Sequence, residues 1–275
     1  MKIKKILMFL GVTIGVISSF QINSKAASDW IYAAPKKTNF YMTKKTIHTT
    51  NGYFKDTPIT IPKGTIFSYY GVNRNGKSQL PFLEIDTSQL GWPVRKPLAT
   101  SKHNQMLTKG IWAKKSLFKI VSTPSYLKFY DNQNARKVNR HVSGPIQFWK
   151  GSKYIDGSAY ETNQIVVTTD GYLEYTQPYN IYDRYNKQPL GYAKILQTIQ
   201  KNGTLYYYYN SKINGIPATR LSGKYKYRTS VKKTGIKRVT VIPRGKPYFG
   251  DDSYAVSNIF SIGGQSFYTI GYFGH

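Results

Sequence analysis

The clearest β-hairpin signal in the chain lies in residues Ile59–Leu98, ITIPKGTIFSYYGVNRNGKSQLPFLEIDTSQLGWPVRKPL. An aromatic strand, Ile66 to Tyr70, follows Gly64 and leads to Asn75-Gly76, after which a second β-favouring run begins. Asn-Gly between two such runs indicates a tight hairpin, because both central residues of a type I′ turn need positive φ. The return strand leads into Gly91-Trp92 and a basic tail. This stretch therefore predicts a basic, β-rich unit.

The composition favours an all-β protein with a polyanionic partner. The 275 residues include 25 Tyr and 23 Gly but no Cys. Tyr and Thr favour strands, whereas Gly and Asn favour turns. The formal net charge of +28 gives a positive field that attracts polyanions such as nucleic acid, anionic lipid, polysaccharide or polyphosphate polymers.

The N-terminus has the pattern of a secretory signal peptide. Basic residues precede the apolar run Ile6 to Phe20, and Ser24-Lys25-Ala26 offers small residues for cleavage after Ala26. The apolar run is shorter than the roughly 20 residues that span a bilayer. We therefore expect residues 1–26 to be removed and the mature chain to be secreted, without a transmembrane anchor, and associated with the cell wall or cell surface. The lack of Cys fits an exported protein of Gram-positive bacteria.

The opening pattern recurs along the chain and indicates divergent internal repeats. A glycine stands two residues before an apolar strand position, an Asn-Gly or Asp-Gly pair follows nine or ten residues after that position, and a further glycine closes the unit. The three sets are Gly64, Ile66, Asn75 and Gly91; Gly144, Ile146, Asp156 and Gly171; and Gly203, Leu205, Asn214 and Gly223. Short strands with turns at such intervals predict small antiparallel barrels or sandwiches.

These repeats divide the chain into units. We expect a first module at residues 27–100, a linker at 101–116, a second module at 117–178, a third at 179–232 and a degraded or partial β module at 233–275. Helical periodicity is scarce. The best helical candidate is Leu190 to Gln200, which would place Tyr192, Ile195, Leu196 and Ile199 on one face.

The sequence holds no constellation that indicates catalysis or metal binding. Four histidines are scattered without partners at metal-ligand spacing, and the lack of Cys excludes cysteine nucleophiles. Glu84 and Asp86 share a face of an expected strand, as a catalytic carboxylate pair would, but solvent-facing carboxylates that offset nearby lysines would look the same. We expect no enzyme activity, no cofactor and no metal.

Aromatic side chains interleaved with bases form the candidate ligand site. Lys and Arg can neutralise phosphates, and the flat faces of Tyr and Trp can stack on sugar rings. Because side chains alternate between the two faces of a strand, about half of the aromatics fill the core. In Tyr206 to Tyr209 both faces carry Tyr, so two rings point away from the core, where they either bind ligand or pack between modules. The predicted polyanion-binding residues are Tyr69, Tyr70, Arg74, Lys77, Trp92, Arg95, Lys96, Trp149, Lys150, Lys153, Tyr206, Tyr208, Lys224, Lys226, Arg228, Lys232, Lys233, Lys237 and Arg238.

The pattern from Lys77 to Leu98 resembles the end of a bacterial SH3-like module of the GW type. The matching positions are Gly91, Trp92, Val94 and Arg95, and the preceding IPKGTIFSYYG is similar to the turn and strand that open the central sheet of SH3-like cell-wall modules. The resemblance implies tandem SH3-like barrels. It also implies non-covalent attachment to the Gram-positive envelope, commonly through lipoteichoic acid, as in surface proteins of lactobacilli, listeriae and staphylococci.

The sequence thus predicts a secreted, non-catalytic protein that binds an anionic wall polymer, lipoteichoic or wall teichoic acid, by electrostatic and aromatic contacts. A surface adhesin that binds host glycosaminoglycan or mucin is the alternative, and a cell-wall hydrolase with an unrecognised site is a further one. A nucleic-acid partner is not expected, because the signal peptide directs the chain out of the cell.

Overall fold

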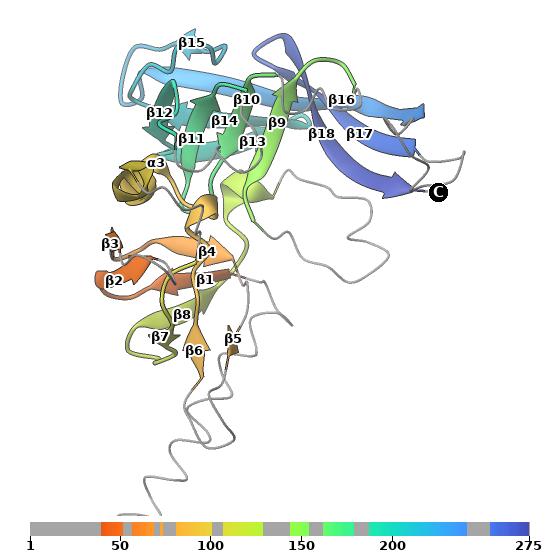
Figure 1. Ribbon diagram of the computed structural model, residues 1–275. Helices are drawn as coiled ribbons and strands as arrows, with labels where there is room; N and C mark the ends of the chain where they lie inside the picture. Colours follow the sequence, from red (N-terminus) through yellow and green to blue (C-terminus); the bar gives the residue numbers. More distant parts are fainter. Residues whose placement is uncertain are drawn as a thin grey trace, which may run out of the picture.

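Most of the regular structure in the described residues is antiparallel β-sheet, as the sequence predicts (Figure 1). The computed structural model describes residues 40–51, 57–68, 72–73, 81–100, 107–128, 144–153, 162–178, 187–240 and 254–274. The expected signal peptide at residues 1–26 lies outside these ranges. None of the helices within them has the length and hydrophobicity of a membrane span.

Three small sheets make up the N-terminal lobe, which we define as the described residues from 40 to 128. Its strands are β1 (Phe40–Thr43), β2 (Ile47–Asn51), β3 (Thr57–Ile61), β4 (Ile66–Ser68), β5 (Val72–Asn73), β6 (Phe82–Leu83), β7 (Ile111–Trp112) and β8 (Phe118–Val121). Its short helices are η2 (Thr87–Gln89), α3 (Trp92–Arg95), η3 (Lys96–Thr100) and η4 (Ser125–Leu127). The sheets have the strand orders β4-β1-β8, β2-β3 and β5-β6-β7.

Aromatic rings from three strands form the core of this lobe. The rings of Tyr41 and Phe67 stack with their centroids 5.7 Å apart, and Phe118 meets Phe67 edge-on at the same separation. All three side chains are buried. Phe118 belongs to β8, which lies in the expected second unit but pairs with β1 of the first.

One ten-stranded sheet makes up the C-terminal lobe, which we define as the described residues from 144 to 274. Its strands are β9 (Ile146–Lys150), β10 (Gln164–Val167), β11 (Tyr172–Thr176), β12 (Gly191–Lys194), β13 (Gln197–Lys201), β14 (Thr204–Tyr209), β15 (Thr219–Arg220), β16 (Tyr227–Thr240), β17 (Tyr254–Ile262) and β18 (Gln265–Gly274). The strand order is β12-β11-β10-β9-β18-β17-β16-β14-β13, and β15 pairs with β16.

This sheet curls into a half-barrel. β12 and β13 stand at opposite ends of the strand order, yet only Ile195 and Leu196 separate them in the chain. The N–H of Ile195 donates to the carbonyl of Gly171, and the N–H of Leu196 donates to the carbonyl of Tyr208, both at 2.9 Å. This corner therefore connects the two ends of the sheet and encloses its inner face.

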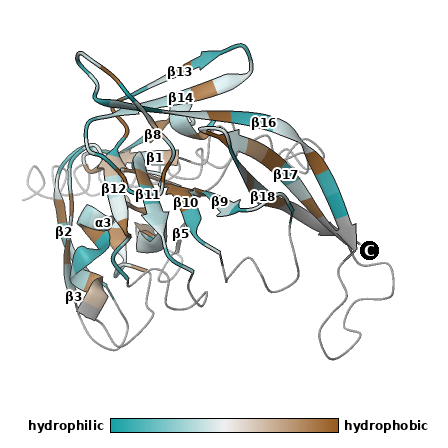
Figure 2. Cartoon of the chain, turned by 90° about the horizontal axis from the view of Figure 1, so that it is seen from above, coloured by the Kyte–Doolittle hydropathy of each residue, from teal (hydrophilic) through white to brown (hydrophobic). Residues whose placement is uncertain are grey.

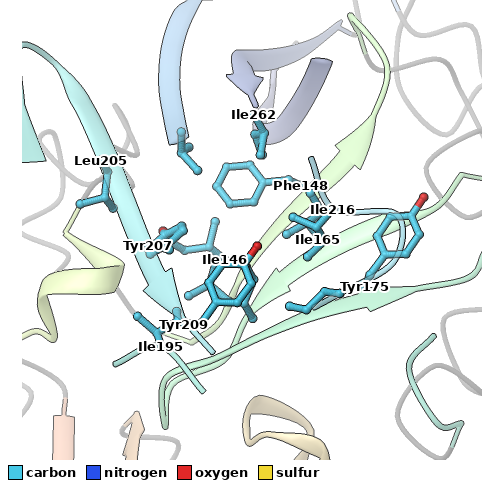
Figure 3. Close-up of a cluster of buried hydrophobic side chains, with 14 of the residues drawn as sticks. Ile146, Phe148, Ile165, Tyr175, Ile195, Leu205, Tyr207, Tyr209, Ile216 and Ile262 are labelled. Atoms are coloured by element: carbon cyan, nitrogen blue, oxygen red, sulfur yellow. The ribbon is translucent and has the colours of Figure 1, made fainter. Parts of the chain in front are cut away.

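The inner face of the half-barrel holds the larger of the hydrophobic cores (Figure 3). Tyr207 of β14, Phe148 of β9 and Ile262 of β17 converge there, and each is fully or almost fully buried. Phe148 also meets Phe260 edge-on, with ring centroids 5.1 Å apart. Burying one large apolar side chain contributes about 1.5–3 kcal/mol, so this core is the main source of the lobe's stability.

The predicted helix at Leu190 to Gln200 is wrong, because the structure places β12 and β13 there. β12 pairs with β11 and β13 pairs with β14, so both strands complete a sheet that a helix could not join. Ala193 and Ile195 point into the core, while Tyr192, Leu196 and Ile199 are exposed. Two short strands that meet at a corner can place apolar residues three and four apart, which imitates the helical period.

The leading glycines of the three repeats share one backbone conformation. The φ angle is +86° at Gly64, +80° at Gly144 and +70° at Gly203, and a Cβ at these positions would meet nothing within 4 Å. The left-handed turn, and not crowding, therefore requires glycine there. The repeated element is thus a turn that opens a strand.

The units expected from the repeats share strands and sheets. The expected boundary between residues 232 and 233 falls inside β16, and β7 of the expected linker pairs with β6. β9 of the second unit pairs with β18 of the C-terminal unit, with Trp149 opposite Tyr268. Pairing across the unit boundaries therefore completes the large sheet.

Candidate polyanion-binding face

Strand β14 divides its four tyrosines between two faces of the sheet. Tyr207 and Tyr209 are fully buried in the core, with 0% exposure, whereas Tyr206 and Tyr208 lie partly exposed on the opposite face. The sequence predicts that two rings point outward, and the structure shows which two they are. These two rings form the centre of the candidate site.

Neighbouring strands add bases to the same face. Arg228 lies opposite Tyr208 and Lys232 lies opposite Thr204 on β16, and on the other side Ile199 of β13 lies opposite Tyr206. Cross-strand partners project from the same face of a sheet, so these side chains lie together. We call this the outer face and define it as the side chains of Ile199, Lys201, Tyr206, Tyr208, Lys224, Tyr225, Arg228 and Lys232. Figure 2 shows β13, β14 and β16 from above.

Aromatic and cation–π contacts order the outer face. The guanidinium carbon of Arg228 lies 5.0 Å from the ring centroid of Tyr206. The rings of Tyr208 and Tyr225 are tilted by 52° with their centroids 5.5 Å apart, and Lys224 Nζ lies 5.3 Å from the Tyr225 centroid. Each exposed cation–π contact is worth about 0.5–1 kcal/mol, which orients the side chains while leaving their cations in water.

The electrostatic field around the outer face is positive. Strands β12 to β18 carry no Asp or Glu in the described part of the chain. The described carboxylates are Glu84 and Asp86 in the N-terminal lobe and the buried pair Asp170 and Glu174. The bases of this face thus have no acid on their own strands to neutralise them, as a polyanion-binding surface requires.

The other predicted bases of this region lie outside the set that defines the outer face. Lys226 is exposed directly after Tyr225, and its backbone N–H donates to Asn210 Oδ1 at 3.0 Å. Lys233, Lys237 and Arg238 lie on the part of β16 that continues past its pairing with β14. They extend the basic strand without joining the aromatic centre.

Among the described residues, the predicted site residues of the earlier units do not join the outer face. Trp149 is partly exposed on β9, where it stacks on Tyr268 with centroids 5.9 Å apart, and Lys150 and Lys153 are exposed at the end of that strand. Lys96 is exposed on η3. The predicted site residues Tyr69, Tyr70, Arg74 and Lys77 lie outside the described residues.

Trp92 and Arg95, which the sequence places in the ligand site, are instead buried between the two lobes. Their exposures are 3% and 4%. The Trp92 N–H donates to Glu174 Oε1 at 2.6 Å, Arg95 Nη2 donates to Glu174 Oε2 at 2.5 Å, and Arg95 Nε donates to the carbonyl of Leu90. A guanidinium held in this way is withdrawn from solvent. The Gly-Trp segment therefore joins the lobes instead of contacting a polymer.

A second carboxylate completes this junction. Asp170 Oδ1 accepts the N–H of Gly91 at 2.8 Å and the hydroxyl of Thr168 at 2.6 Å, and Lys194 Nζ donates to the Asp170 carbonyl. Burial raises the pKa of Asp170, while Thr168, Lys194 and the Gly91 N–H act in the opposite direction. Burial also raises the pKa of Glu174 against the effect of Arg95. Both carboxylates are thus buried and hydrogen-bonded to residues of the junction itself.

Of the two carboxylates considered for catalysis, Asp86 caps a short helix. Glu84 and Asp86 share the partly exposed face of their segment, as predicted, and Leu83 and Ile85 point inward. Asp86 Oδ1 accepts the N–H of Ser88 at 2.9 Å and so caps η2. Within the described ranges, no group of three or more His, Asp or Glu side chains is placed to hold a metal ion.

Three residues of the outer face are absent from the predicted set. Ile199 and Lys201 fall in or beside the stretch interpreted as a helix, and an alternating pattern from Gln197 to Lys201 would have placed them on a strand face. Tyr225 precedes β16 in the run KYKYR, where its alternation with lysines could have indicated an aromatic residue among bases. Its contact with Tyr208 depends on tertiary structure.

Comparison with protein-family models, with curated proteins and with solved structures found no match to this chain. The fold and the outer face thus define only a class, an all-β protein with a basic aromatic surface.

Proposed function

We propose that this protein is a secreted, non-catalytic protein that binds an anionic polymer of the Gram-positive wall, lipoteichoic or wall teichoic acid. The observation that carries the proposal is the outer face, where Tyr206, Tyr208 and Tyr225 lie among Lys201, Lys224, Arg228 and Lys232 on strands without acidic residues. The cations attract the polymer's negative groups, and the rings offer flat surfaces to its uncharged parts.

The position of the bases supports a reversible, salt-sensitive mode of attachment. Lys201, Lys224 and Lys232 are exposed, so water and salt screen their interactions. Lys233, Lys237 and Arg238 continue the basic strand and widen the field that attracts a long polymer. Several weak contacts along one polymer raise retention through effective concentration. The proposal includes SH3-like modules as the units from which the fold derives. It bases them on the resemblance of residues 77–98 to GW modules.

A pull-down with purified walls tests the proposal. The mature protein is mixed with native walls and with walls stripped of teichoic acids, and the bound fraction is measured from low salt to molar salt. We expect strong binding to native walls, weak binding to stripped walls and release at high salt. Equal binding to both walls, or retention at molar salt, would contradict the proposal. Binding to heparin that exceeds binding to native walls would favour the adhesin alternative.

A further inference from the structure

We infer that the outer face selects polyanions that contain sugar rings, and that it holds such a chain along β14 with rings on Tyr206 and Tyr208 and negative groups at both ends. The inference rests on the proposed function and deepens it by naming the chemical class of the polymer. It separates anionic polysaccharides, and polyol phosphates that carry sugars, from polymers with charge alone.

Three lysines of the outer face stand at the two ends of an aromatic strip. At one end Lys224 contacts Tyr225, which itself contacts Tyr208. The backbone of Arg228 lies opposite Tyr208, and its guanidinium lies over the ring of Tyr206. At the other end Lys201 and Lys232 flank Thr204, one on each neighbouring strand. From Thr204 to Tyr208 the strand advances four residues, or about 13 Å at about 3.3 Å per residue. Lysine charge is therefore sited at both ends of an aromatic stretch, and the Arg228 guanidinium adds one cation beside the ring of Tyr206.

The middle of the strip is suited to flat, weakly polar surfaces. Tyr206 and Tyr208 are two residues apart on one face, so their rings follow each other at about 7 Å along the strand. Ile199 lies opposite Tyr206 and is 41% exposed, which adds apolar surface beside the ring. The C–H face of a sugar ring can cover these groups and remove them from water.

A polymer with charge alone satisfies only part of this surface. Polyphosphate could pair with Lys201, Lys232 and Arg228, but it offers no apolar face to Tyr206, Tyr208 or Ile199. Exposed ion pairs contribute little each and are screened by salt. Ring contacts are not screened, so the ring-containing polymer should remain bound at salt concentrations that release polyphosphate.

Two polymers of matched chain length test the inference, polygalacturonate with sugar rings and polyphosphate without them. Affinities of the full mature chain are measured at about 0.05 and 0.3 M salt, around the range where screening becomes strong. The variants are Tyr206→Ala/Tyr208→Ala, the ring-retaining control Tyr206→Phe/Tyr208→Phe, and the charge variant Lys201→Gln/Lys232→Gln. Far-ultraviolet circular dichroism and thermal unfolding confirm that each variant is folded.

We expect the double Ala variant (the Ala pair) to lose about tenfold in affinity for polygalacturonate and less than about twofold for polyphosphate. The double Phe variant (the Phe pair) should bind both polymers about as well as the wild type does. The charge variant should weaken both polymers. Equal losses on both polymers for the Ala pair, no loss on either, or a Phe pair as weak as the Ala pair would overturn the inference. Wild-type binding to polyphosphate alone would overturn it while leaving the proposed function intact. Binding to neither polymer nor to native walls would overturn both.

Discussion

Arg95 and Glu174 form a buried ion pair, with 2.5 Å between Nη2 and Oε2, that joins the N-terminal lobe to strand β11. The same carboxylate accepts the backbone N–H of Trp92, so the Glu174 side chain both pairs with the Arg95 cation and accepts a backbone N–H at the start of α3. The Arg95 guanidinium also lies 5.6 Å from the Trp92 ring centroid. Arg95, which the sequence predicts to bind a polyanion, thus pairs with a carboxylate inside the protein.

Breaking this pair from one side should be more costly than changing both partners. Arg95→Met leaves the Glu174 carboxylate buried without its cation and should lower the free energy of unfolding by about 3–5 kcal/mol. In Arg95→Met/Glu174→Gln the neutral amide can still accept the Trp92 N–H, so the double variant should regain part of the loss. Urea unfolding of the wild type, both single variants and the double variant gives the coupling energy. Additive losses would show that the two side chains do not interact energetically.

Gly91 should tolerate no side chain, because Tyr172 packs against its backbone. A Cβ at Gly91 would lie 2.3 Å from Cδ2 and 2.7 Å from Cγ of Tyr172, which is near the base of that ring. Gly91→Ala should therefore reduce the unfolding free energy by about 1–3 kcal/mol, as overpacking commonly does. The matched control is Gly235→Ala on β16, where a Cβ would meet nothing within 4 Å.

A second substitution separates crowding from other effects of Gly91→Ala. Tyr172→Ala removes the ring that Gly91 accommodates, so adding Gly91→Ala to it should cost much less than in the wild type. Thermal unfolding of the four proteins measures this difference. A cost of Gly91→Ala that is the same with and without the Tyr172 ring would refute the steric explanation.

Buried phenols should make the protein sensitive to alkaline pH. Burial raises the pKa of Tyr207, and burial together with the nearby Asp170 raises the pKa of Tyr126. Above the ordinary tyrosine pKa of about 10, the unfolded chain loses these protons while the folded chain retains them. Stability therefore falls as pH rises, by up to about 1.4 kcal/mol per pH unit for each such group.

Tyr207→Phe provides the measurement of this alkaline effect. The variant keeps the ring but loses the hydrogen bond from the Tyr207 hydroxyl to the carbonyl of Tyr126, 3.0 Å long. It should be about 1 kcal/mol less stable at pH 7. Between pH 10 and 11.5 its stability should decline less steeply than that of the wild type. Parallel curves over that range would show that the Tyr207 phenol does not resist ionisation in the folded protein.

Local patterns in the sequence predict the sheet content, the glycine turns and the outward tyrosines, whereas the contacts between distant strands escape them. The turns at Gly64 and Gly203 depend on backbone conformation, and the alternation along β14 depends on strand geometry, so a few adjacent residues determine each of them. The fit of Gly91 against Tyr172 joins residues far apart in the chain. Short repeats likewise could not show that β9 pairs with β18, because the same β-favouring pattern suits pairing within a unit or between units.

Wall binding should depend on the cations of the outer face and not on the net charge of the whole protein. Lys201→Gln/Arg228→Gln/Lys232→Gln removes three cations beside Tyr206 and Tyr208, and should weaken binding to native walls about tenfold and flatten its dependence on salt. The matched control, Lys114→Gln/Lys115→Gln/Lys119→Gln, removes three exposed cations of the N-terminal lobe and should leave both quantities nearly unchanged. Wall binding is measured as a function of salt for the wild type and both triple variants. If the two variants lost the same affinity, binding would follow net charge, and the outer face would not be the site.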